Sequence, residues 1–508
     1  MEKNRFKEAL LERNEFVYTL ELVPGRGSRG KTQDDILKIA EKAAKSKLVH
    51  AVSITDNPGG HPALSPDVIG LEISRLGIDP IIHFTCKDKN RNQIESILYS
   101  LDRIGISNLL VMTGDFPLYG FEGKAKPVFD LDSIQLIHLI HQMNQGLDID
   151  GKAPGGGVRL PPTHFFKACT LSPFKKYESE VMSQYYKLFK KIKEGGDFLI
   201  TQVGFDARKF DELLRYTRYH ALRIPILGNV YILNHSVAKI MNQGGVPGCV
   251  VTDELYRICQ EEVKTIDKGK KARLTRAAKL IAILKGMGFN GVHIGGPSLS
   301  YEDVEWLIEK GKELSLNWEP WAHEFSFPQK NGFYLFEKDQ KTGLNTDVFV
   351  HKGSKPHKAL GHGIMRFFHH LAFTPEAPLY KPARWFFKKI DGTRLESPAT
   401  ELEYWIKFIS SRCRRCGDCT LLEVAFLCPQ SQCPKYLFNG QCGGSFEGWC
   451  EVFPGKKRCI YFRAYNRLKP YGEEGSLKDG YTLPRNWELD QTSSWVNYFL
   501  SRDHRSQK

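Results

Sequence analysis

The feature that most constrains the fold of this chain is an alternation of short apolar segments with amphipathic ones, repeated eight times over about 300 residues. The apolar segments are rich in β-branched and aromatic residues and end near turn-forming residues, as β-strands do. Eight strand–helix units predict an α/β fold of the (β/α)8 TIM-barrel class, with parallel strands inside and helices outside. A doubly wound sheet is the alternative, but it more commonly has five or six strands, and no GxGxxG follows the first segment. The expected strands are 16–24, 50–58, 80–88, 107–115, 164–173, 198–206, 224–234 and 291–296.

Several helix boundaries carry their own signals. Thr32 is a plausible N-cap for a helix over 32–47, and Ser65 with Pro66 begins the next helix. A pair of glycines closes the helix over 178–196. The other expected helices span 90–105, 130–145, 208–222 and 301–315, with a long helical region that ends near residue 288.

Polar residues recur where the expected strands end. In a barrel the active site lies where the carboxyl ends of the strands meet, so these side chains should form one ring. Glu21 is costly to bury unless it is paired or protonated. Taken alone, Glu21 could simply reach solvent, and His83 could be a core histidine bonded to backbone. Together they indicate an active site. The ring comprises Glu21, Thr55, Asp56, His83, Thr85, Thr113, Gly114, Asp115, Thr170, Gln202, Asn229 and His293.

The net charge of the chain limits the classes of ligand that it is expected to bind. A net charge of +14 and a pI near 9.1 favour anionic ligands. No nucleic-acid-binding motif is found, so anionic small molecules are expected and nucleic acid is not. No apolar run approaches a membrane span, and the charged N-terminus is not a secretory signal. We therefore expect a cytoplasmic protein without a membrane partner.

Residues 25–32, GRGSRGKT, match the phosphate-binding pattern GxxxxGK[ST] between a strand and a helix. In that interpretation Lys31 would meet nucleotide phosphates and Thr32 a magnesium ion. Alternatively, residues 25–32 form a glycine-rich turn in which Thr32 caps the following helix. A nucleotide-binding protein therefore remains the alternative function.

Five segments, in order, resemble the methylenetetrahydrofolate reductase family: ELVPGRG, SITDNPGG, IHFTCKD, VMTGDFP and ITQVGFD. The resemblance runs over residues 10–315. That family is a flavin-containing (β/α)8 barrel that reduces a methylene-pterin to a methyl-pterin. The resemblance implies an oxidoreductase of one-carbon metabolism that acts on 5,10-methylenetetrahydrofolate. The implied cofactor is FAD, with FMN possible, and the implied electron source is a donor protein or NAD(P)H.

The resemblance also assigns roles to residues of the ring. Glu21 falls on the general acid, and we expect its apolar surroundings to raise its pKa so that it holds a proton near neutral pH. Asp115 falls on an aspartate that contacts the pterin and tunes the flavin, and Gln202 on a pterin-binding glutamine. The flavin-binding positions correspond to Thr55, His83, Gly114, Asp115 and Lys191.

Three departures from the family pattern stand out. Thr113 replaces an arginine that contacts the flavin, and Cys169-Thr170 stands where the family has a tyrosine. The eighth strand ends in HIGGPSLS, without the Asn and Arg that help to hold the folate tail. These changes affect strict folate recognition more than flavin binding, so a related pterin remains open as substrate.

The length of the chain allows two or three domains. We assign 1–317 to the barrel, 318–400 to a connecting layer around its edge, and 401–508 to a cysteine-rich domain. His362, His369 and His370 lack supporting carboxylates, so packing roles are expected for them. From about residue 484 we expect an amphipathic helix and a polar tail that frays.

Eight of the twelve cysteines lie between residues 413 and 459. In a cytoplasmic protein this density predicts metal or cluster ligation and not disulfides. The CxxCxxC triplet with a later Cys before Pro resembles iron–sulfur ligation of the [4Fe–4S] type, with zinc the alternative. The region resembles a cysteine-rich domain fused to, or partnered with, bacterial reductases of this family, which implies electron relay or attachment to another subunit in an oligomer or larger complex. A structural zinc module in an adaptor protein is the competing view. The first set is Cys413, Cys416, Cys419 and Cys428, and the second is Cys433, Cys442, Cys450 and Cys459.

Overall fold

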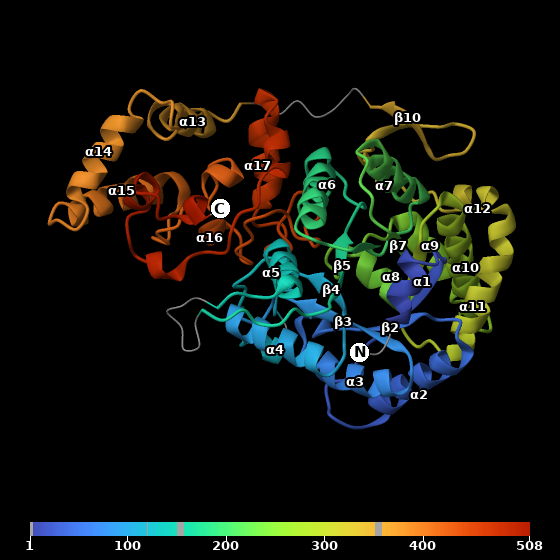
Figure 1. Cartoon of the computed structure of the whole chain (residues 1–508). Helices are drawn as coiled ribbons and strands as arrows, with labels where there is room; N and C mark the ends of the chain where they lie inside the picture. The colour runs from blue at the N-terminus through green and yellow to red at the C-terminus, as the bar shows by residue number, and fades with distance from the viewer. Residues whose placement is uncertain (1–3, 119, 150–156, 351–357, 508) are drawn as a thin grey trace.

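Eight parallel strands close into a barrel in the order β1 to β8, so the predicted barrel is confirmed (Figure 1). This computed structural model describes residues 4–118, 120–149, 157–350 and 358–507. Strand β1 pairs with β2 on one side and with β8 on the other, which closes the sheet. Each expected strand segment corresponds to one of the observed strands, although β3 begins one residue earlier than expected, at Asp79. They are β1 Val17–Leu22, β2 Ala51–Ile54, β3 Asp79–Thr85, β4 Asn108–Met112, β5 Phe166–Leu171, β6 Phe198–Thr201, β7 Ile226–Tyr231 and β8 Gly291–Gly295.

The helices that follow the strands surround the barrel. One boundary prediction is wrong: α2 begins at Lys31 with Gly30 as its N-cap, so Thr32 already lies inside the helix and cannot cap it. The long helical region before residue 288 consists of three helices. The surrounding helices are α2 Lys31–Ser46, α3 Pro66–Arg75, α4 Arg91–Arg103, α5 Ser133–Gln145, α6 Glu178–Lys193, α7 Ala207–Tyr219, α8 His235–Asn242, α9 Asp253–Glu262, α10 Lys270–Met287 and α11 Tyr301–Leu314.

Side chains alternate between the inside and the outside of the barrel, as the strand period requires. Along β1, Tyr18, Leu20 and Leu22 belong to the core shared with the surrounding helices, whereas Val17 packs in the barrel interior. Thr19 and Glu21 continue the inward face of β1. The inward face therefore changes from apolar to polar toward the carboxyl end of the strand, and this change positions the site.

A short helix plugs the opposite, amino-terminal end of the barrel. In α1 (Arg5–Leu11) the Phe6 ring is fully buried, 6.1 Å from the Phe166 ring and 5.4 Å from the Phe198 ring. The Phe6 backbone N–H donates to Asp79 Oδ2 at 2.7 Å. Apolar packing and one long-range hydrogen bond thus seal this end.

The expected connecting layer is divided between two parts of the molecule. Helix α12 (Glu319–Glu324) packs on α10, and β10 (Asn345–Phe349), paired with β9 (Phe336–Lys338), packs on α7. Helix α14, in contrast, packs on α18 near the end of the chain. Figure 1 shows α13, α14 and α15 beside the carboxyl-terminal segment, away from the barrel. These helices are α13 Leu360–Ala372, α14 Tyr380–Ile390 and α15 Glu396–Ser411.

The carboxyl-terminal segment adds α16 (Pro429–Gln432), α17 (Ile460–Leu468) and α18 (Ser494–Phe499), of which α17 packs on α6. The expected fraying of the tail is wrong. His504 is buried and its Nδ1 lies 2.5 Å from Asp418 Oδ1.

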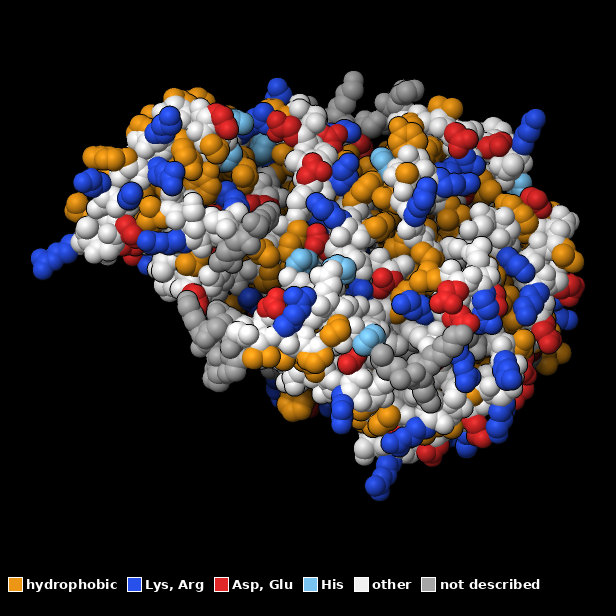
Figure 2. Space-filling model, viewed as in Figure 1, with side chains coloured by type: hydrophobic (Ala, Val, Ile, Leu, Met, Phe, Trp, Pro, Cys, Tyr) orange, Lys and Arg blue, Asp and Glu red, His pale blue; other side chains and the backbone are white. Residues whose placement is uncertain are grey.

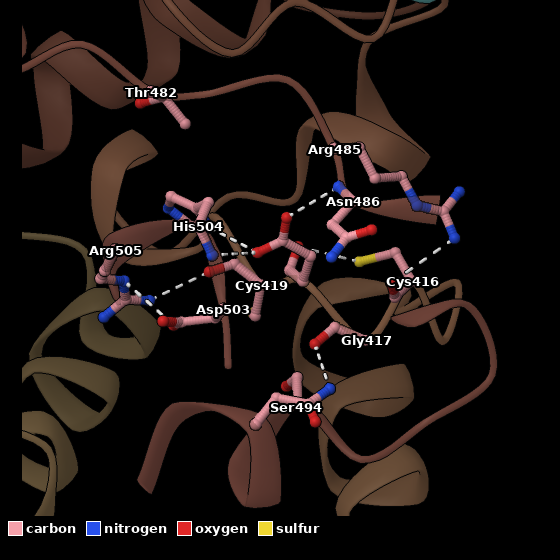
Figure 3. A network of polar contacts seen from close by, with 12 residues as sticks. Cys416, Gly417, Cys419, Thr482, Arg485, Asn486, Ser494, Asp503, His504 and Arg505 are labelled. Atoms are coloured by element: carbon pink, nitrogen blue, oxygen red, sulfur yellow. Dashed lines mark hydrogen bonds and ion pairs between the residues drawn. The ribbon is translucent and has the colours of Figure 1, made fainter. Parts of the chain in front are cut away.

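The tail therefore holds the segment that carries the first cysteines (Figure 3). Burial disfavours the charged imidazole of His504, but its contacts with Asp418 and Glu423 outweigh burial and raise its pKa to about 9. Arg505 Nη2 donates to the Cys419 carbonyl at 3.0 Å. Ion pairing and burial of these side chains, absent from any local sequence pattern, replace the expected disorder.

Replacing Phe6 by Ala should destabilise the barrel by about 3–5 kcal/mol, because it removes a fully buried ring and leaves a cavity. Leu11→Ala, on the exposed side of the same helix, is the matched control and should cost less than about 1 kcal/mol. The measurement is urea unfolding followed by circular dichroism. Equal costs for the two variants would show that α1 is not a plug.

Candidate functional site

A cavity of about 500 Å³ lies at the carboxyl ends of the strands. All eight strands, or the residues directly after them, contribute to its wall. The structure thus brings together every residue of the predicted ring, while the role of each remains a prediction. The twelve are Glu21, Thr55, Asp56, His83, Thr85, Thr113, Gly114, Asp115, Thr170, Gln202, Asn229 and His293.

A chain of polar contacts leads from Glu21 to the barrel interior. Glu21 Oε2 lies 3.7 Å from His293 Nε2, and His293 Nδ1 lies 2.8 Å from Thr19 Oγ1. The same Nε2 lies 3.4 Å from Ser53 Oγ. Neither Thr19 nor Ser53 was singled out from the sequence, although both follow from the period-2 alternation of β1 and β2.

Glu21, His83 and His293 offer ligand-type atoms within 4.8 Å of one another. Two imidazoles and a carboxylate are donors that a metal ion accepts. However, both ring nitrogens of His293 already face a hydroxyl group. His293 is thus held by two hydroxyl groups beside Glu21.

The expectation of a raised pKa for Glu21 is wrong. Burial acts to raise it, but the hydrogen bond and charge of His293, together with His83, outweigh burial and lower the pKa. For His83, burial dominates and lowers the pKa to about 4. The site therefore holds a carboxylate at Glu21 beside a neutral imidazole at His83.

Lysines surround another part of the cavity. Lys191, predicted near the flavin phosphates, extends from α6, and its amino group donates to the Thr170 carbonyl. Burial, followed by the charge of nearby Lys187, lowers the Lys191 pKa to about 7. Lys187 and Lys87 also line the cavity. The lining of the cavity thus holds lysines as well as the carboxylates Glu21, Asp56, Asp115 and Glu451.

The turn after β4 is built around Gly114. Its φ of +85° is in the left-handed region, and a Cβ atom would lie 2.9 Å from Thr85 Cβ and from Lys87 Cδ. Asp115 Oδ2 accepts a hydrogen bond from the Gly59 N–H at 2.9 Å. Glycine is therefore required at position 114, a predicted flavin contact, because a side chain there would collide with Thr85 and Lys87. Asp115 is held in place by the neighbouring loop at Gly59.

The cavity wall suits a large polar ligand. Several buried polar atoms on it have no hydrogen-bond partner among the described residues, and buried polar atoms normally have one. Together with the lysines, these atoms fit a cofactor that has ring heteroatoms and phosphate groups. They are Thr55 Oγ1, His83 Nε2, Ser133 Oγ, Ser172 Oγ, Asn229 Oδ1 and Gln441 Oε1.

Part of the cavity wall comes from the carboxyl-terminal segment. Lys435 Nζ donates to the Gly114 carbonyl at 2.7 Å and pairs with Glu451. Cys442 and Gly443 line the same cavity. Sequence reasoning missed Lys435 because its partner is 321 positions away and no local pattern marks such a contact.

Polar contacts fix this segment against the barrel. Asp132 Oδ1 caps α5, while its Oδ2 accepts from the N–H groups of Phe438 and Asn439 at 3.1 and 2.9 Å. Gln184 Nε2 donates to the Cys442 carbonyl at 3.0 Å. Because Asp132 serves both parts, the helix end and the segment are positioned together.

The eight cysteines gather in the two predicted sets. Cys413, Cys416, Cys419 and Cys428 line one small pocket, beside Lys407, whose Nζ lies 3.2 Å from Cys419 Sγ. The second pocket lies next to the barrel cavity, and Cys442 lines both. Among the described residues, no three of these sulfur atoms lie within 4.8 Å of one another. The second set is Cys433, Cys442, Cys450 and Cys459.

The glycine-rich turn at residues 25–30 is held by its own side chains. Gln33 accepts from the Gly25 N–H at 2.9 Å and donates to the Gly25 carbonyl. The Lys31 side chain is 90% exposed and pairs with Asp35 at 3.0 Å. The arrangement gives no support to a nucleotide-phosphate site.

The barrel with its polar cavity defines the class of an α/β-barrel enzyme site. A family model described as "Methylenetetrahydrofolate reductase" matches residues 6–298, and one described as "Methylene-tetrahydrofolate reductase C terminal" matches residues 393–488. The first match covers more than half of the chain. The chain belongs to the methylenetetrahydrofolate reductase family.

Curated relatives agree with this assignment. "Methylenetetrahydrofolate reductase 2" of Saccharomyces cerevisiae is 25% identical over 37% of this chain and 30% of that protein. The protein of the same name from Schizosaccharomyces pombe is 24% identical over 35% of this chain and 27% of its own length. A "Probable methylenetetrahydrofolate reductase (NADPH)" of Caenorhabditis elegans is 24% identical over 44% and 31%. The chain thus spans less than a third of the length of these relatives.

Among solved structures, an uncharacterized Clostridium thermocellum protein that binds two copies of 5-methyl-5,6,7,8-tetrahydrofolic acid aligns with a TM-score of 0.42 and 14% identity. The alignment covers 61% of this chain and 98% of that one. Within the described residues, no helix combines the length and apolar character needed to cross a membrane.

The buried, neutral His83 should make the protein acid-sensitive. Its pKa is about 4 in the folded state and about 6.5 when unfolded, so the unfolded state binds the extra proton as pH falls. Between pH 7 and pH 4.5 this should cost about 2–3 kcal/mol of unfolding free energy, which His83→Asn should not lose. Urea unfolding at both pH values measures it. The same pH dependence in both proteins would contradict the assignment.

Proposed function

We propose that this protein is a flavin-dependent reductase that converts 5,10-methylenetetrahydrofolate, or a closely related methylene-pterin, to its methyl form. The observation that carries the proposal is the Glu21–His293–Thr19 chain at the strand ends of a barrel of this family. A carboxylate beside a histidine in a buried polar cavity is suited to proton transfer.

Flavin binding is supported by the unpartnered polar atoms and by the lysines of the cavity. Family membership favours FAD, with FMN possible. Thr55, His83 and the Gly114–Asp115 turn would contact the ring system, and Lys191 would meet the phosphates together with Lys187. Bound flavin would supply the hydride chemistry that side chains lack.

The protein's own contribution is to hold and deliver a proton. Glu21 Oε2 lies 3.7 Å from His293 Nε2, and the Thr19 hydroxyl contacts Nδ1 of the same ring, which fixes the ring beside Glu21. Delivered to the bridging nitrogen of the methylene-pterin, this proton opens the ring to an iminium. Because the Glu21 pKa is lowered, Glu21 must take up a proton before each transfer to the substrate.

Asp115 and Gln202 are proposed to bind the pterin. Both line the cavity, and Asp115 is fixed through the Gly59 N–H. The departures at Thr113, Thr170 and the end of β8 leave the folate tail with fewer of the family's contacts, so the pterin ring should provide most of the recognition.

Replacing Glu21 by Gln should lower turnover of the methylene substrate by about 10²–10⁴-fold, because the amide cannot donate an acidic proton. Flavin content and reduction of the flavin by dithionite should remain unchanged. His293→Asn should lower turnover and shift its pH profile, while Lys38→Gln on the outer surface of α2 serves as control. Loss of flavin from the Glu21 variant would instead assign Glu21 a structural role.

We propose further that both cysteine sets bind iron–sulfur clusters. In the first set, the CxxCxxC triplet followed by Cys428 before Pro429 favours an iron–sulfur cluster over zinc. A [4Fe–4S] cluster takes each of four thiolates on a different iron, and each set supplies four cysteines around one pocket. Clusters here would supply one-electron transfer to the barrel, and the sharing of Cys442 between cavity and second pocket supports this.

Cys416→Ala should remove about half of the iron from anaerobically purified protein, because it deletes a ligand of the first set only. The variant should retain its flavin, and a small dye should still reduce it. Cys259→Ala, a buried cysteine of α9, is the control and should keep all the iron. Zinc in place of iron in the wild-type protein would overturn the cluster assignment.

A further inference from the structure

Helix α15 buries its polar face and exposes its apolar face, which is the reverse of the usual arrangement. Its buried face consists of the polar residues Glu403, Lys407 and Ser411. Lys407 Nζ lies 3.1 Å from Glu403 Oε1, and the Glu403 carboxylate accepts hydrogen bonds from the hydroxyl groups of Ser493 and Ser494, both at 2.6 Å. The inward face is therefore satisfied by polar contacts near the first cysteine set.

The outward face of α15 is apolar. A helix normally places such residues against a core, and a contiguous exposed group of them marks an interaction surface. Figure 2 shows hydrophobic side chains gathered over the region of α13, α14 and α15, with Lys and Arg among them. On α15 the side chains are between 44% and 82% exposed: Leu402, Trp405, Ile406, Phe408 and Ile409.

A basic hollow adjoins this apolar face. It has a volume of about 890 Å³, and Phe408 and Ile409 form one side of it. Arg412, Arg414 and Lys457 are exposed in it, and no Asp or Glu is among the described residues that line it. Arg412 and Arg414 make no ion pair within the described part of the chain. The hollow is thus positively charged, although Arg415, which also lines it, pairs with Glu401.

The hollow also reaches the first cysteine set. Cys413 lines both the hollow and the small pocket that holds Cys416, Cys419 and Cys428. A protein seated in the hollow would therefore come directly against a proposed cluster ligand. The second set is separate from the hollow and adjoins the barrel cavity instead.

We propose that the outer face of α15 and the basic hollow form the docking surface for a small acidic electron-carrier protein. The apolar residues provide the buried centre of such an interface, and the arginines provide steering and orientation. The inference rests on the proposed reductase function. Reduction of a methylene to a methyl group consumes two electrons and two protons, so two carriers that each lose one electron would serve one turnover, with the protons drawn from solvent.

Two other occupants fit less well. A lipid bilayer could meet the apolar residues, but its flat surface would not follow the hollow down to Cys413. A second copy of this chain, related by two-fold symmetry, would bring two surfaces of the same positive charge together. An acidic carrier satisfies both the charge and the shape.

The test measures binding of a bacterial two-cluster ferredoxin, used as the acidic probe, to the full-length holoprotein by calorimetry. Wild-type protein should bind it at low ionic strength and more weakly at high ionic strength. The double variant Arg412→Glu/Arg414→Glu should raise Kd at least about tenfold, and Ile409→Ser should raise it severalfold. Lys38→Glu/Lys271→Glu, which reverses two exposed charges on α2 and α10, is the matched control and should bind as wild type does.

Iron content equal to wild type in each variant, with unchanged flavin reduction by a dye, confirms that the effect is on docking. No binding by the wild-type protein, or equal binding by the arginine variant, overturns the proposal. So does binding to anionic phospholipid vesicles, or self-association in ultracentrifugation, that is lost in Ile409→Ser. Because binding is measured without turnover, a protein that binds ferredoxin but reduces no pterin would reject the proposed function and leave the docking surface standing.

Discussion

Closure of the parallel sheet between β1 and β8 is the constraint on which the rest of the site depends. In a closed barrel every second side chain must enter a crowded interior, so each strand has a fixed inward face. In β1 this face runs from Val17 through Thr19 to Glu21, and β8 brings His293 alongside. Loss of the β1–β8 pairing would separate Glu21 from His293. The polar pair is thus a consequence of sheet closure.

A second level of organisation joins the barrel to the cysteine-rich segment. Asp132 links the start of α5 to residues 438 and 439, and Lys435 reaches the carbonyl of Gly114 in the turn after β4. Both contacts are buried and charge-assisted, so removal of one partner would leave a polar group without compensation. The two parts behave as one structural unit around the cavity, although separate family models match them.

Much of the barrel and the identity of its polar ring could be predicted because strand period and turn residues are local signals. The eight strands and residues such as Glu21, His83 and Gln202 followed from these signals. Contacts between distant segments could not be predicted: Lys435 at the cavity, the neighbours that lower the Glu21 pKa, and the burial of His504. Thr32 failed as a helix cap because Gly30 takes that position. The burial of the polar face of α15 could not be predicted either, since a helical period does not reveal which face is buried.

The position of Lys435 has a consequence for the order of assembly. Its amino group bridges Gly114 and Glu451, so the cavity has its final wall only after the carboxyl-terminal segment has docked. The barrel and the carboxyl-terminal segment must therefore both be present for the cavity to have this shape. A fragment that ends before residue 435 would therefore have a wider and more open cavity than the whole chain has.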